Sequence, residues 1–198
     1  MAGFVAGLLG ATVSAATVFI FAGLGELITE RAGVLNLGVE GMMLGGALGG
    51  FIATVVTESP WLGLCAGIGV GMLLAGIHAF LCITLKANQV ISGVMLTLLG
   101  AGLTTFYGAG WVDRSIDGFS EVTVPLVGQY LIQIPVIGEA LFSNTPTDYI
   151  ALALVPATWY LLNRSNLGLE LVSVGEDPEM ADTMGVSVFK LRYLAGVI

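Results

Sequence analysis

The sequence is poor in charged residues and in cysteine. Only 10% of its 198 residues are Asp, Glu, Lys or Arg, against about 25% in soluble globular domains. Six Lys and Arg stand against fourteen Asp and Glu, and the formal net charge of −8 argues against nucleic-acid binding. Two cysteines make no disulfide framework, and a hydrophobic share of 56% excludes a disordered chain. These exclusions leave a membrane protein with several spans.

Motifs typical of enzymes and metalloproteins are also missing. No G-x-x-x-x-G-K-[ST] loop is present, so we do not expect this chain to bind a nucleotide itself. The single histidine, His78, has only Cys82 within one helical turn as a second metal-binding side chain, and two ligands make no metal site. We therefore interpret His78 as a packing residue. No nucleophile triad or carboxylate pair is visible, so neither catalysis nor a bound cofactor is expected.

Long runs without charge are what the sequence does contain. A helix that crosses a bilayer needs about 20 mainly apolar residues. A sixth span begins near residue 190 and is cut off at Ile198, so we expect the sequence to be incomplete at its C-terminus. The prediction is an all-α polytopic membrane protein with a single transmembrane domain over residues 1–198. Five full spans are predicted, near residues 3–25, 36–56, 61–85, 89–109 and 147–163.

Basic residues predict the orientation of these spans. With five alternating spans, one side receives five basic residues and the other receives only Arg114. Because cytoplasmic loops carry an excess of Lys and Arg, we expect the first side to be cytoplasmic. Its basic residues are Arg31, Lys86, Arg164, Lys190 and Arg192.

The opposite side would then hold an external loop over residues 110–147. This loop contains a weaker apolar run, 122–138, which holds Pro125 and Pro135 and predicts an interfacial helix rather than a span. Charged residues in and beside the loop predict an acidic external surface, which either docks a partner or is only solvated. They are Asp113, Arg114, Asp117, Glu121 and Asp148.

Glycine is abundant. The 29 glycines are about twice the average share of ~7%. Small residues recur every four positions within the predicted spans, as at Gly41, Gly45 and Gly49 or at Gly63 and Gly67. Such ridges let helix backbones approach closely in a membrane. They predict a glycine-rich helix bundle, although packing of this kind does not identify a substrate.

Polar residues interrupt the apolar pattern over residues 25–43. Asn36 and Glu40 are one helical turn apart and could share a face toward a permeation path. Ionisable residues near a bilayer are costly, which makes Glu40 a functional candidate. The alternative is a solvated cytoplasmic turn in which Glu40 is stabilised by the dipole at a helix N-terminus.

A second polar interruption lies over residues 86–93. Asn88 and Gln89 precede an apolar run, and Ser92 follows within one turn. These three side chains either cap the start of the helix or face a permeation path. Capping is the favoured interpretation, and a permeation path is the alternative.

The segment after the fifth predicted span contains clear helix start and stop signals. Asp177 followed by Pro178 is typical of an N-cap and a first helical residue. Glu179 suits the dipole of the first turn, and Gly185 predicts the end of the helix. A helix of about two turns is unstable alone in water. It therefore needs a partner surface, or it packs on its own bundle.

Several segments of the sequence resemble a known protein family. Glu179-Met-Ala181-x-x-x-Gly185 resembles the E-A-A-x-x-x-G coupling loop of ABC importer permeases, with Met180 in place of the middle alanine. The strings GELITERAGVLNLGVEGMM, NQVISG and VGEDPEMADTMGV resemble permeases of nucleoside and simple-sugar importers, in the branched-chain amino acid/ribose permease superfamily. The resemblance implies the transmembrane domain of a type II ABC importer, with a cytoplasmic coupling loop over residues 164–190. The implied coupling residues are Gly175, Glu176, Asp177, Pro178, Glu179, Ala181 and Gly185.

The resemblance also implies a function and partners. It implies an importer for nucleosides in a bacterial or archaeal plasma membrane, working by alternating access and driven by separate ABC ATPase subunits. A second, related permease and an extracytoplasmic substrate-binding protein would complete it. Ribose-like sugars and branched-chain amino acids remain alternative substrates. Candidate residues of the substrate path are Asn36, Glu40, Asn88, Gln89 and Ser92.

Two other classes of function stay open at this stage. An ion-coupled secondary transporter would require inverted repeats and carboxylates in mid-span, and only Glu40 approaches that role. A structural membrane anchor would not need a helix of the coupling type that ends at Gly185.

Overall fold

The computed structural model describes the chain except for residues 1, 117, 121, 124–142 and 198, and it divides into two compact units. The smaller unit comprises Met1–Leu24 and Gly118–Trp159, and the larger unit comprises Gly25–Asp117 and Tyr160–Ile198. Helices α1 (Ala2–Arg31) and α7 (Pro146–Arg164) each contribute residues to both units.

Four helices of the described residues are long and apolar enough to cross a membrane. They are Gly7–Arg31, Val39–Thr57, Pro60–Thr84 and Gln89–Trp111. These helices coincide with the first four predicted spans, so the polytopic helical architecture is confirmed. Helix α7 forms where the fifth span is expected, but it is not among these four helices, and its ends carry polar residues such as Asp148 and Asn163. The count of five full spans and the start of a sixth therefore stays a prediction.

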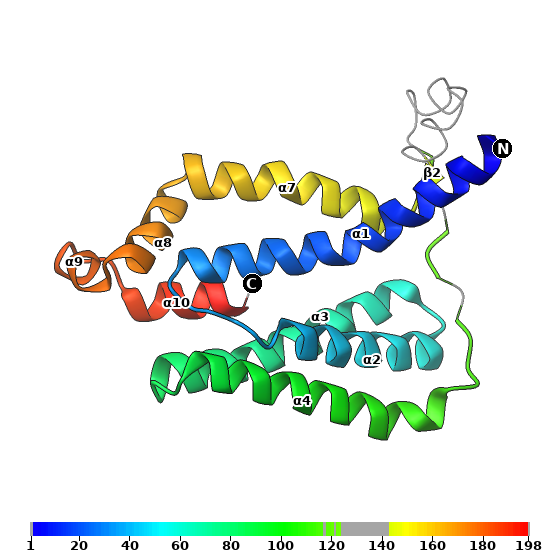
Figure 1. Cartoon of the computed structure of the whole chain (residues 1–198), viewed down its shortest axis with the longest axis horizontal. Coiled ribbons are helices and arrows are strands. Elements are labelled where there is room, and N and C mark those ends of the chain that lie inside the picture. Colours follow the sequence, from blue (N-terminus) through cyan, green and yellow to red (C-terminus); the bar gives the residue numbers. More distant parts are fainter. Residues whose placement is uncertain (1, 117, 121, 124–142, 198) are drawn as a thin grey trace. The chain divides into compact units, whose positions relative to one another are not determined.

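In the larger unit, α2 (Val39–Thr57) packs against α3 (Pro60–Ala79) and α4 (Gln89–Gly108) (Figure 1). Helix α3 continues as a π-helical turn, η1 (Phe80–Thr84), and α4 continues as a 3-10 turn, η2 (Ala109–Trp111). Many large apolar side chains of these helices are exposed, as expected for surfaces that face lipid.

Glycines set how closely these helices approach. A Cβ atom on Gly41 would overlap the backbone of Leu96 in α4, and one on Gly100 would overlap the backbone of Gly41. A Cβ on Gly67 would lie 3.0 Å from the carbonyl oxygen of Gly46. The predicted ridges are therefore real contacts at these points. They are not contacts everywhere, since nothing lies within 4 Å of the corresponding position on Gly7 or Gly71.

Three shorter helices follow α7 in the larger unit: α8 (Asn166–Glu176), α9 (Pro178–Thr183) and α10 (Val188–Val197). The sequence analysis predicts α9 and the start of α10 but not α8. The side chain of Ser165 caps α8 by accepting a hydrogen bond of 3.0 Å from the N–H group of Gly168. These helices and the end of α1 share one buried apolar core, made of Ile28, Ala32, Leu171, Val174, Ala181, Leu191 and Ala195.

The smaller unit contains a two-stranded antiparallel sheet. Strand β1 (Val122–Thr123) pairs with β2 (Ser143–Asn144), with Val122 opposite Asn144. Residues 122–123 are thus extended where an interfacial helix over 122–138 is predicted. The remainder of that predicted helix lies outside the described residues.

Asp148 joins α7 to α1 within the smaller unit. Its side chain is buried, with 2% exposed, and accepts hydrogen bonds from Thr17 Oγ1 at 2.6 Å and from Ser14 Oγ at 3.3 Å. It also accepts from the N–H group and the hydroxyl of Thr145, at 3.0 and 2.7 Å. The prediction that Asp148 belongs to an acidic external surface is therefore wrong, because hydroxyl groups of α1 satisfy this carboxylate inside the protein.

We predict that Gly100→Ala lowers the free energy of unfolding by about 1–3 kcal/mol, because the new methyl group must displace the backbone of Gly41. Gly102→Ala is the matched control on the same helix, since nothing lies within 4 Å of its Cβ position. Equilibrium unfolding in detergent micelles measures both variants. Equal losses in the two would contradict the α2–α4 contact.

We predict that Asp148→Ala destabilises the protein by at least about 1.5 kcal/mol, because it removes a charged acceptor from several hydrogen bonds. Asp113→Ala removes the same kind of charge from an exposed position and should have little effect. Thermal unfolding in micelles compares the two. Similar melting temperatures would argue against the buried carboxylate.

Candidate functional site

The connection between α1 and α2 begins with a tight turn at Gly33. Its φ of +78° lies in the left-handed region, which glycine adopts without the steric cost of a Cβ atom. The N–H group of Gly33 donates to the carbonyl of Glu30 at 2.9 Å, and that of Val34 donates to Thr29 at 3.0 Å. This pair of bonds is a Schellman motif, which satisfies the last carbonyls of α1.

Beyond this turn the backbone is irregular until α2 begins at Val39. Side chains from three helices satisfy it. The N–H group of Leu35 donates to Gln89 Oε1 at 2.8 Å, and its carbonyl accepts from His78 Nε2 at 3.2 Å. The N–H group of Asn36 donates to Glu26 Oε1 at 3.1 Å. Non-helical backbone in a membrane protein is tolerated where protein groups or water pair with it.

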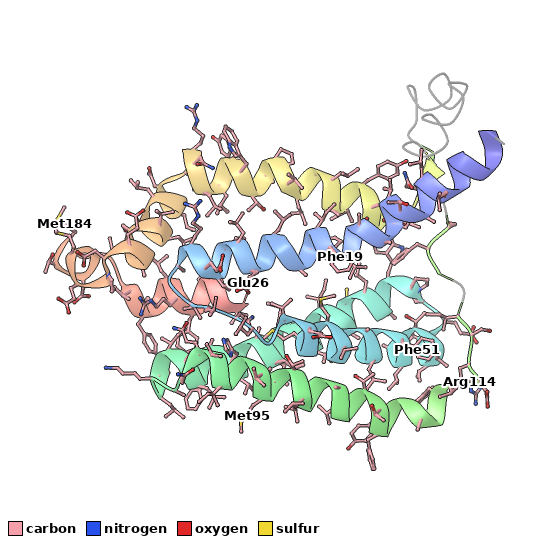
Figure 2. The ribbon with its side chains drawn as sticks, viewed as in Figure 1. Phe19, Glu26, Phe51, Met95, Arg114 and Met184 are labelled. Carbon is pink, nitrogen blue, oxygen red and sulfur yellow. The ribbon has the colours of Figure 1, made fainter. Side chains whose placement is uncertain are left out.

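We call this arrangement the polar junction and define it as residues 33–38 with Glu26, His78, Gln89 and Ser92. It connects the end of α1 with α3 and α4 inside the larger unit. Figure 2 labels Glu26, which lies near the end of α1.

His78 holds the centre of the polar junction. Because the Leu35 carbonyl can only accept, the His78 ring carries its proton on Nε2. In the neutral ring Nδ1 is then an acceptor, and the hydroxyl of Ser92 donates to it at 3.0 Å. Both side chains are buried, with 2% and 4% exposed. Cys82 Sγ lies 3.6 Å from Nε2. The ring is thus a satisfied packing residue, as the sequence analysis interprets it, and it also supports the irregular backbone.

The structure brings together three of the five residues predicted for the substrate path. Gln89 and Ser92 lie in the polar junction, as does Asn36, which is buried and accepts a 3.0 Å hydrogen bond from the N–H group of Gly38. Glu40 is exposed in the first turn of α2. Asn36 and Glu40 do not share a helical face, because α2 begins only at Val39.

Asn88 lies outside the polar junction and caps α4. Its Oδ1 accepts from the N–H groups of Val90 and Ile91, at 3.0 and 3.2 Å. Of the two roles left open by the sequence, the structure therefore gives Asn88 the capping role, whereas Gln89 and Ser92 point to other elements.

Sequence reasoning missed Glu26 and the central position of His78. His78 is a polar residue inside a long apolar run, and Glu26 lies in the polar interruption over residues 25–43. Their main partners are the backbone groups of Asn36 and Leu35. A backbone partner has no signature in the sequence.

The predicted helix start and stop signals in the coupling loop are confirmed as local structure. Asp177 is the N-cap of α9 and accepts from the N–H group of Met180 at 2.9 Å, and Pro178 is the first helical residue. Gly185 has a φ of +85° and donates to the carbonyl of Asp182 at 2.9 Å. Val186 donates to Ala181 at 3.0 Å, which completes a second Schellman motif.

A groove of about 380 Å³ lies between α8 and α9. Met180 and Met184 on its border are 63% and 79% exposed, and Figure 2 shows Met184 projecting from α9. Flexible methionines beside an apolar groove are typical of protein-binding surfaces. Glu170, Glu176 and Asp177 add negative charge to the lining.

Six of the seven predicted coupling residues divide into two groups, and the seventh, Pro178, is half-buried between them in the first turn of α9. Glu176, Asp177, Glu179 and Gly185 are exposed. Ala181 is buried in the core below α9, and Gly175 contacts the end of α1, where a Cβ atom would overlap the carbonyl of Arg31. The segment thus has an outer surface and a firmly packed inner side.

Residues 7–198 match the family described as branched-chain amino acid transport system / permease component. The chain is 69% identical to a permease of Haloferax volcanii with a provisional assignment to a glucose ABC transporter, over 98% of this chain and 59% of that protein. It is 36% identical to the guanosine ABC transporter permease of Bacillus subtilis, over 95% of this chain and 61% of that protein.

A third relative is the nucleoside ABC transporter permease of Lactococcus lactis, at 34% identity over 92% of this chain and 59% of that protein. The chain thus spans about three fifths of the length of these relatives. No solved structure matches the chain.

We predict that Ser92→Ala costs about 1–3 kcal/mol of stability, because the buried His78 Nδ1 loses the hydroxyl that donates to it at 3.0 Å and keeps only the weaker thiol of Cys82 at 3.8 Å among the described residues. In a His78→Phe background the same serine change should cost much less, so the two changes should show a coupling energy above about 0.5 kcal/mol. Unfolding of the two single variants and the double variant in micelles measures it. Thr105→Ala is the control, because that hydroxyl bonds only to Ala101 of its own helix. Strict additivity would contradict the His78–Ser92 bond.

Proposed function

Because the chain belongs to the family of permease components of branched-chain amino acid transport systems, we propose that it forms the membrane-spanning part of an ATP-driven importer. It is a multi-pass membrane protein, and members of this family are transport subunits rather than enzymes. The observation that carries the proposal is α9: a short capped helix that exposes Met180 and Met184 beside a groove, in a chain of long apolar helices.

The proposed mechanism is alternating access. Two ATPase subunits on the cytoplasmic side bind ATP, close on each other and push α9 together with the segment from Gly175 to Gly185. A second, related permease completes the pore, and an extracytoplasmic binding protein delivers the substrate. No covalent bond forms on this chain. The segment has one side for a partner and one side for its own core, which is the property that such a transfer of motion requires.

The proposed orientation places α9 in the cytoplasm of a bacterial or archaeal cell. Several basic residues gather at one end of the larger unit. Arg31 is the last residue of α1 and lies in contact with Gly175. Lys86 lies in the turn just after Thr84, and the hydroxyl of Thr84 is hydrogen-bonded to Tyr193 of α10 at 2.5 Å. An excess of basic residues is typical of the cytoplasmic side of a plasma membrane protein. A fifth span over α7 would fit the same orientation.

The proposed substrate is a nucleoside. Two of the relatives transport guanosine or nucleosides by name and come from two different bacteria. Glucose is the second candidate, because the relative with 69% identity is assigned to a glucose transporter. Ribose and leucine are weaker alternatives that the same experiment addresses.

The test uses the complete importer with its ATPase subunits, second permease and binding protein in proteoliposomes. Uptake of radiolabelled guanosine and of radiolabelled glucose is measured with and without ATP, with unlabelled ribose and leucine as competitors. ATP-dependent, saturable uptake of guanosine supports the nucleoside proposal. Uptake of glucose alone, or uptake displaced only by ribose or leucine, keeps the importer and changes its substrate. Uptake that follows an ion gradient rather than ATP would support a secondary transporter.

We predict that Met184→Glu weakens ATPase binding about tenfold or more, because it places a charge on the exposed apolar surface of α9. Asn166→Glu is the matched control. This substitution adds the same negative charge at an exposed position. Asn166 is the first residue of α8 and does not line the groove. Co-purification with the ATPase and ATP-dependent uptake measure both variants. Normal ATPase binding by Met184→Glu would contradict the assignment of α9 as the coupling helix.

A further inference from the structure

Arg192 of α10 binds the ends of two other helices. Its Nε donates to the carbonyl of Ala32, directly after the end of α1, at 3.2 Å. Its Nη2 donates to the carbonyl of Val174, in the last turn of α8, at 3.5 Å. The last carbonyls of a helix lack partners within that helix and carry a partial negative charge, so they suit a guanidinium group.

Two glycines bring these helix ends together at the same point. A Cβ atom on Gly33 would lie 3.1 Å from the Cα atom of Gly175 and 3.2 Å from Arg192 Nη2. A Cβ atom on Gly175 would overlap the carbonyl of Arg31. Helices α1, α8 and α10 therefore meet at a contact that has no room for a further side-chain atom.

Each of the joined helix ends leads directly to a functional segment. Helix α8 ends at Glu176, next to Asp177, which caps α9. Helix α1 ends next to the irregular backbone at Leu35 and Asn36, which forms the polar junction. Arg192 thus stands between the proposed coupling helix and the residues predicted for the substrate path. All of these residues belong to the larger unit.

The shared core below Arg192 would hold the three helices together without it. Seven apolar residues from α1, α8, α9 and α10 make that core. The guanidinium adds fixed geometry, because its planar donors bind two carbonyls from two helices at once. A lysine would keep the charge but present a single ammonium centre.

We propose that Arg192 is the positioning residue that couples movement of α9 to the polar junction. It joins the ends of α8 and α1, so that a displacement of the coupling helix moves the α1–α2 connection with it. The proposal rests on the proposed function, because it assigns to Arg192 a role in the same importer.

The test measures uptake per ATP hydrolysed in the complete importer, reconstituted in proteoliposomes, with guanosine and glucose as the two labelled probes. Arg192→Met is expected to keep ATPase binding and ATP hydrolysis but to lower uptake per ATP by about tenfold or more, because it removes both hydrogen bonds of the guanidinium and the loss of even one hydrogen bond to a charged group corresponds to about a factor of ten. Arg192→Lys should restore part of this ratio. Lys86→Met is the control, because it removes an exposed basic residue from the turn next to α10.

The possible outcomes separate this proposal from the function on which it rests. An unchanged ratio in Arg192→Met, or full coupling in Arg192→Lys, would overturn the role of the guanidinium. Loss of uptake and hydrolysis in parallel, together with a lower melting temperature and loss of the ATPase, would show a purely structural role and would also overturn it. If Arg192→Met does not fold, the ratio in Arg192→Lys decides. Absence of ATP-dependent uptake in the unsubstituted importer would overturn the proposed function instead.

Discussion

The peptide groups of Leu35 govern the arrangement of the larger unit. They lie in a stretch of non-helical backbone between two apolar helices, so they have no partners within a helix and must find them elsewhere. The N–H group of Leu35 donates to Gln89 Oε1 on α4, and its carbonyl accepts from His78 Nε2 on α3. The need to satisfy one residue's backbone therefore fixes the positions of two helices relative to the α1–α2 connection. Ser92 and Glu26 extend the same network by one bond each, to His78 and to Asn36.

The other end of the connection is held by different chemistry. There the carbonyls that end α1 and α8 face a guanidinium group, and glycine backbones are in contact. Contacts thus run from Gly175, at the end of α8, and from Arg192 to Gly33 and Ala32, where the polar junction begins. Spatial continuity of this kind is consistent with transfer of motion, and only a functional measurement demonstrates it.

Much of this organisation can be predicted from the sequence because it depends on local rules. Charge-free runs locate the four long apolar helices closely, since the thickness of a bilayer sets the length of such runs. The limits of α9 follow from Asp177, Pro178 and Gly185, whose roles are set by the backbone within one turn. By contrast, α8 was missed, because its first turn has no acidic residue and its cap, Ser165, has no specific sequence context.

The features that could not be predicted depend on contacts between distant residues. Glu26 and His78 bind backbone groups of other elements. Every residue has such backbone groups, so the residue type of the partner does not indicate the contact. Asp148 was misjudged for a similar reason: its hydroxyl partners Ser14 and Thr17 lie more than 130 positions earlier in the chain. The resemblance to permeases identifies the family, whereas the contacts in the structure show the structural role of each residue.

One consequence concerns how the protein can be observed. The chain has one histidine, and that residue sits at the centre of the polar junction with a defined proton on Nε2. Nitrogen-15 labelling of histidine would therefore place two resonances in the whole chain, one facing the Leu35 carbonyl and one facing Ser92. Their chemical shifts would report any change in the two hydrogen bonds that His78 makes beside the α1–α2 connection, without an engineered label or a change of sequence.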